Sequence, residues 1–149
     1  MIGQVSTDRN STSGYVFILA EGPISWSSKK QSVIALSSTE AEYRGVVNVA
    51  TQCLWLQGLL GECGFESEYS TTIYCDKQST IQIYNDPVQK QRTKHIEIHM
   101  HYIRELVHDV TIHLLFCSSS EQVADIFTKA FFEKTFSNLK SLLGLLIML

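Results

Sequence analysis

The chain has 149 residues, a hydrophobic content of 44% and a formal net charge of -3 at pH 7. This length suits one domain with a sizeable core, and the composition is ordinary for a globular protein. The acidic balance argues against a strongly basic nucleic-acid binder, although a local basic patch can still contact phosphates. The four cysteines have no metal-ligand spacing, which favours reduced thiols in an intracellular chain.

The two ends of the chain lack the patterns of targeting segments. "MIGQVSTDRN" has no apolar core of the kind that opens a secretory signal. The closing run "SLLGLLIML" is apolar over only about half the length that a membrane span needs. We therefore expect a docked terminal helix, no membrane partner and an intracellular location.

Strands come first along the chain. Aromatic and branched residues at 14–20 and the alternation of apolar and polar residues at 24–28 predict two antiparallel strands. The segment 32–36 reads as a third extended run. We expect Trp26 in the second strand, and Trp55 further along the chain, to fill core rather than stack on bases.

A long helix is predicted next. Ser37 and Glu40 have the spacing of a capping box, which marks the helix start, and Gly61 and Gly64 supply its end. Apolar residues recur at three and four along it and predict a wide buried face against a sheet. They are Tyr43, Val46, Val47, Ala50 and Leu54, with Val49, Cys53, Leu56 and Leu60 beside them.

The second half of the chain alternates strands with helices. Its patterns predict a strand at 71–75, a short helix at 78–86, a helix at 94–109, a strand at 111–117 and a last helix from 121 onward. This order predicts a single α/β domain over 1–149 with a mixed, partly parallel sheet flanked by helices.

Three carboxylates lie at strand ends or in the helices beside them, where the functional residues of such sheets commonly cluster. Glu42 lies in the first turn of the long helix, Asp76 ends a strand, and Asp125 lies near the start of the last predicted helix. Oxygen ligands of this kind suit Mg²⁺, and two such ions can drive phosphodiester cleavage. A structural alternative stays open, in which Glu42 and Asp125 stabilise helix N-termini and Asp76 is a turn residue.

Basic and imidazole side chains gather on the helix at 94–109 and the loop before it. Arg92, Lys94 and Arg104 could contact phosphates, or they could simply keep the surface soluble. His95 and His99 share a helix face, but the sequence places no third zinc ligand beside them. A solvated or nucleic-acid-facing surface is the simpler interpretation.

Six motifs follow one another with the spacing of a known family. They are "RNSTSGYVF", "GPISWSSKKQSVIALSSTEAEY", "LWLQGLL", "IYCDKQST", "RTKHIEIHMHYIREL" and "QVADIFTKAF". From about residue 3 to 145 the chain resembles the ribonuclease H domain of the Pol polyprotein of copia-type LTR retrotransposons, and 146–149 form a divergent apolar tail. The resemblance implies a ribonuclease H-like fold and Mg²⁺-dependent hydrolysis of RNA in RNA–DNA hybrids during reverse transcription. The implied partners are the hybrid and the reverse transcriptase and integrase portions of the same polyprotein.

The resemblance also implies roles for individual residues. Glu42, Asp76 and Asp125 match family carboxylates that bind metal and carry catalysis, whereas Glu40 matches the residue that caps the helix. Lys77 stands where the family usually has an asparagine beside the aspartate, which places a cation close to the expected metals.

One family motif has no counterpart in these residues. The family carries a strand of the type "GYSDADWAGD" before "STSGY", with its first catalytic aspartate, whereas this sequence reads "MIGQVSTDRN". By resemblance we expect a fold that lacks the central first strand, weak Mg²⁺ binding and a copy without activity. Open sheet edges would then invite self-association. The alternative is a nucleic-acid-binding or interaction module that has lost catalysis.

Overall fold

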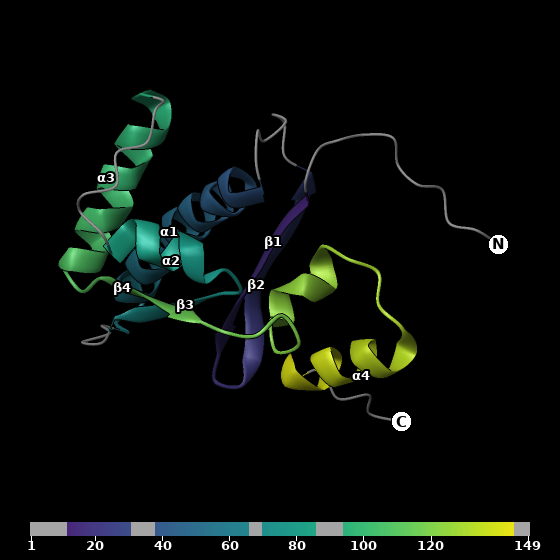
Figure 1. Cartoon of the computed structure of the whole chain (residues 1–149). Coiled ribbons are helices and arrows are strands. Elements are labelled where there is room, and N and C mark those ends of the chain that lie inside the picture. The colour runs from purple at the N-terminus through teal and green to yellow at the C-terminus, as the bar shows by residue number, and fades with distance from the viewer. Residues whose placement is uncertain (1–11, 31–37, 66–69, 86–93, 145–149) are drawn as a thin grey trace. The chain divides into compact units, whose positions relative to one another are not determined.

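The computed structural model describes residues 12–30, 38–65, 70–85 and 94–144, without the side chains of 38–43 and 94–97. Their elements are mixed α/β, as the sequence predicted (Figure 1). The chain divides into two compact units, one made of 1–41 with 123–149 and the other of 42–122. The single domain over 1–149 stays a prediction, and each unit is described by itself.

The first unit is built on a hairpin. β1 (Thr12–Leu19) pairs antiparallel with β2 (Gly22–Lys30), and the register shifts between Phe17 and Ile18. Both strands are longer than predicted, and β2 extends through Lys30. Residues 32–36, where a third run was predicted, lie outside the described residues.

Two residues make the hairpin turn. Ala20 and Glu21 have φ values of 49° and 67°, in the left-handed region that side chains with a Cβ seldom adopt. Tight hairpin turns need positive φ at their central residues because their twist then matches that of the strands. The hairpin therefore carries backbone strain at this turn.

The end of the chain differs from the single helix predicted from residue 121. It forms a 3-10 helix, η1 (Val123–Phe127), and a separate helix, α4 (Glu133–Leu142). The main-chain oxygen of Asp125 accepts hydrogen bonds from the amides of both Thr128 and Lys129, which closes η1. Phe132 is then extended, with φ -65° and ψ 151°, so α4 starts afresh. The prediction of one continuous helix was wrong.

The second unit holds the remaining elements. They are α1 (Ser38–Glu62), β3 (Thr71–Cys75), α2 (Gln78–Asn85), α3 (Lys94–His108) and β4 (Ile112–Phe116). These confirm the predicted order, and the helices lie together beside the parallel β3–β4 pair (Figure 1). No helix among the described residues has the length and apolarity that a membrane crossing requires.

The core of this unit lies on one face of β3 and β4. The stripe predicted on α1 is confirmed in part, because four of its residues are buried and those of its other residues that the structure describes are half-buried. Apolar residues of α2, α3 and the two strands complete the core. Its buried members include Val46, Ala50, Cys53, Leu56, Ile73, Cys75, Ile81, Met100, Ile103, Ile112 and Leu114. Gln57 joins α1 to the strands, since its Nε2 donates to Thr71 Oγ1 at 2.9 Å.

Two predictions about packing did not hold. Trp26 and Trp55 are each 60% exposed, so neither fills core among the described residues. Trp55 lies outside the buried stripe of α1, and Trp26 projects from the exposed positions of β2. The described strands also form two separate two-stranded sheets in place of one mixed sheet. Within these residues no strand pairs with both β1 and β3.

Candidate functional site

Glu42 is the first of the three candidate carboxylates. Its main chain lies in α1, close to the helix start at Ser38, as the sequence predicted. The side chains of Glu42 and of Glu40, the expected capping residue, lie outside the description. Their assignment as site residue and helix cap therefore stays a prediction.

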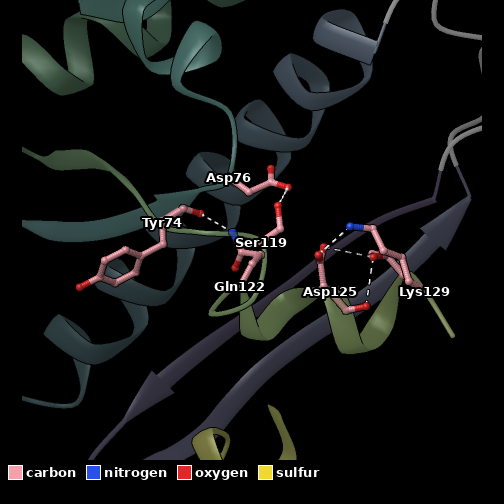
Figure 2. A network of polar contacts seen from close by, with 7 residues as sticks. Tyr74, Asp76, Ser119, Gln122, Asp125 and Lys129 are labelled. Carbon is pink, nitrogen blue, oxygen red and sulfur yellow. Dashed lines mark hydrogen bonds and ion pairs between the residues drawn. The ribbon is translucent and has the colours of Figure 1, made fainter. Parts of the chain in front are cut away.

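Asp76 follows directly on β3 and precedes α2. Its Oδ2 accepts a hydrogen bond of 3.4 Å from Ser119 Oγ, as Figure 2 shows. Gln122 Nε2 donates to the main-chain oxygen of Tyr74 at 3.1 Å, and the amide of Cys117 donates to the oxygen of Cys75 at 2.9 Å. These bonds hold the segment after β4 against the end of β3, so a half-buried carboxylate stands at the carboxyl edge of the parallel pair.

Asp125 lies in η1 and is paired. Its Oδ2 accepts a hydrogen bond from Lys129 Nζ at 2.6 Å (Figure 2). Thr128 Oγ1 lies 3.5 Å from Oδ1. The Asp125 side chain is only 13% exposed, whereas that of Lys129 is 53% exposed. A charge-assisted bond of this length neutralises a carboxylate that is largely withdrawn from water.

The hairpin positions η1. Ser28 Oγ donates to the main-chain oxygen of Phe127 at 2.6 Å. Gly14, the cross-strand partner of Ser28, has no Cβ, and one placed there would meet Thr128 Cγ2 at 2.6 Å. The segment that carries Asp125 therefore rests directly on this residue pair of β1 and β2.

The donor chemistry of Asp76 and Asp125 fits a hard divalent cation, because both present carboxylate oxygens. Among the side chains that the structure describes, which do not include Glu42, no three His, Cys, Asp or Glu form a metal-binding group. Asp76 belongs to the second unit and Asp125 to the first. The convergence of all three carboxylates stays a prediction.

The structure describes only one of the three basic side chains that were predicted to contact phosphates. Arg92 and the side chain of Lys94 lie outside the described residues. Arg104 donates from Nη2 to the main-chain oxygen of Ile83 at 2.8 Å, so it ties α3 to the end of α2. Its role in contacting phosphates stays a prediction. His99 and His101 are exposed, and the side chain of His95 is not described.

Sequence reasoning missed the partner of Asp125. Lys129 lies four residues beyond it, the spacing at which opposite charges meet on a helical turn. That spacing was a usable signal. The tie between Arg104 and Ile83 had no such signal, because it joins two separate helices.

Among known proteins that are similar to the chain, three match it over nearly its whole length. The chain is 39% identical over 146 residues to the retrovirus-related Pol polyprotein from transposon TNT 1-94 of Nicotiana tabacum, covering 97% of this chain and 11% of that protein. It is 38% and 40% identical to those from transposons RE2 and RE1 of Arabidopsis thaliana, over 93% and 92% of this chain. No family model matches the chain, and no solved structure matches it significantly.

The homologues are thus retrovirus-related Pol polyproteins from transposons, and the similarity extends over nearly the whole chain. The chain spans only about a tenth of the length of these curated relatives, between 9% and 11%. It corresponds to one portion of such a polyprotein, and the homology supports a retrotransposon-derived protein.

Proposed function

We propose that the chain is the ribonuclease H portion of a copia-type Pol polyprotein and acts on the RNA strand of RNA–DNA hybrids. The observation that carries the proposal is the order of the family motifs, together with homology to Pol polyproteins over 92–97% of the chain. The proposed partners are the hybrid and the reverse transcriptase and integrase portions of the polyprotein, in an intracellular setting.

In this proposal Glu42, Asp76 and Asp125 are metal ligands and carry catalysis. When bound, divalent cations of the Mg²⁺ type would activate a water and stabilise the leaving oxygen. Ser119 orients the Asp76 carboxylate, and the Ser28–Phe127 bond fixes the segment that holds Asp125. Arg92, Lys94 and Arg104 are the proposed contacts to the hybrid backbone.

The four carboxylates of the family are not all matched within these 149 residues. The one without a match is the family's first catalytic aspartate, which belongs to a strand of the type "YSDADWA". The test therefore compares the chain as printed with the same chain carrying that segment at its N-terminus. We expect Mg²⁺-dependent shortening of hybrid RNA by the extended chain. We expect the printed chain to cleave no faster than its own Glu42→Gln variant, because three carboxylates hold two metals poorly.

Two variants of the extended chain sharpen this test. Asp76→Asn should abolish cleavage, whereas Glu62→Gln, at the end of α1, removes the same charge from an exposed side chain and should leave cleavage unchanged. Equal cleavage by Asp76→Asn and the parent would reject the site. Cleavage by the unextended chain that is lost in Asp76→Asn would show that three carboxylates suffice.

The second candidate function is a nucleic-acid-binding or interaction module without chemistry. Two two-stranded sheets favour it, because such sheets are marginal alone and their edges invite pairing. Hybrid binding by the extended chain without cleavage, or concentration-dependent association in sedimentation, would support this candidate.

A further inference from the structure

The pair of Asp125 and Lys129 has an uneven exposure to water. The carboxylate side chain is 13% exposed and the lysine side chain 53% exposed, and the two meet at 2.6 Å. The ammonium therefore lies on the wetter side of the pair. A cation that approaches Oδ2 of Asp125 meets the ammonium at the position it would need to occupy.

The local main chain holds this arrangement. Asp125 accepts main-chain hydrogen bonds from Thr128 at 2.9 Å and from Lys129 at 3.0 Å, which places the lysine one turn above the carboxylate. The Ser28 hydroxyl fixes the same segment through Phe127. The pair is thus set by the fold of η1 and β2, whereas an accidental surface pair would rest on long mobile side chains alone.

We propose that Lys129 is a counter-ion that the fold places on the Asp125 carboxylate, and that it competes with a divalent cation for this carboxylate. The inference rests on the proposed function, since it describes the regulation of one of its metal ligands. Two cations that share one poorly hydrated carboxylate repel each other strongly. A divalent ion therefore binds Asp125 only when the ammonium leaves, and the affinity of the site is set by this exchange.

The test is the binding of Mn²⁺ to the full 149-residue chain, with free Mn²⁺ measured by its paramagnetic resonance signal. Lys129→Gln and Lys129→Met remove the ammonium, and each should bind Mn²⁺ about tenfold more tightly than the parent because the competing charge is gone. Lys129→Arg keeps a cation and should stay within about threefold of the parent. Adding Asp125→Asn to Lys129→Gln should abolish the gain.

A matched control separates local competition from net charge. Lys134→Gln, at the exposed start of α4, removes the same charge from the same unit and should leave Mn²⁺ binding unchanged. Equal gains for Lys134→Gln and Lys129→Gln would overturn the proposal, as would unchanged or undetectable binding in both Lys129 variants. Loss of folded circular dichroism in both would make Lys129 a purely structural partner and would also overturn it.

The readout is independent of hybrid cleavage. Tighter Mn²⁺ binding by Lys129→Gln, with no cleavage by the extended chain, would support the counter-ion role of Lys129 and contradict the ribonuclease H proposal. Cleavage by the extended chain, with unchanged Mn²⁺ affinity in Lys129→Gln, would support the ribonuclease H proposal and contradict the counter-ion role.

Discussion

Ser28 and Phe127 lie 99 positions apart and are joined by a hydrogen bond of 2.6 Å, from the serine hydroxyl to the phenylalanine main-chain oxygen. The bond links the second strand of the hairpin to the 3-10 helix that carries Asp125. Beside it, Gly14 leaves the room that Thr128 fills. The position of one proposed metal ligand therefore depends on the far end of the chain.

Gly14→Ala should destabilise the protein by about 1–3 kcal/mol, because its methyl group overpacks against η1. A Cβ there lies 2.6 Å from Thr128 Cγ2 and 3.2 Å from Phe127 Cβ. Gly58→Ala is the control, since a Cβ at Gly58 meets nothing within 4 Å in α1. It should add about 0.5–1 kcal/mol of stability. Urea unfolding measures both, and equal effects would contradict the packing.

The hairpin turn offers a gain in stability. Ala20 and Glu21 have positive φ, so the double variant Ala20→Asn, Glu21→Gly should relieve about 1–2 kcal/mol of strain. Glu105→Gly, in the interior of α3, should instead cost about 1 kcal/mol. The shift in melting temperature checks both signs. A loss of stability in the turn variant would mean that the strain is absent.

Cys53 predicts a dependence of stability on alkaline pH. Burial raises the pKa of this thiol above its ordinary value of 9.0, and a hydrogen bond with Thr71 partly offsets the rise. Above about pH 9 the unfolded chain loses this proton while the folded chain keeps it, so the free energy of unfolding falls as pH rises. Denaturant unfolding at pH 8 and pH 10 should show a smaller loss in Cys53→Ala than in the parent. Equal losses would contradict the prediction.

Much of the fold was readable from local pattern. The strand at Thr71–Cys75 was predicted with the bounds it has, and the helices that became α2 and α3 were predicted to within about one residue. Short apolar runs and three-and-four spacing report directly on one buried face. Val46, Ala50, Cys53 and Leu56 of the predicted α1 stripe are buried for the same reason.

The misses arise where local pattern and wider contacts disagree. A helical period continues through residues 121–144, but the carbonyl of Asp125 takes two amide donors and ends the turn there. Strand pairing over long distances is also invisible to a single sequence, so the division into two sheets could not be predicted. Of the site, the residue types and their order were predicted, whereas the Lys129 partner was missed although its spacing of four residues from Asp125 was a usable signal.

Hybrid binding, if it uses Arg92 and Lys94, should weaken steeply with salt, because each phosphate contact releases counterions. The double variant Arg92→Ala, Lys94→Ala should weaken binding. It should also make the slope of log K against log salt concentration shallower, by an amount that corresponds to roughly two phosphate contacts. Fluorescence anisotropy at several salt concentrations measures both quantities. Lys134→Ala with Lys140→Ala is the control pair on α4. An unchanged slope in the Arg92, Lys94 variant would contradict the assignment.

The most direct measurement follows both strands of one RNA–DNA hybrid, each carrying its own label, in Mg²⁺ with the chain extended by "YSDADWA". The ribonuclease H proposal predicts that the RNA strand shortens, that the DNA strand stays intact, and that double-stranded DNA is not cut. Asp76→Asn should stop this cleavage, and Glu62→Gln should not. Cutting of the DNA strand, or RNA cleavage that persists in Asp76→Asn, would contradict the proposal.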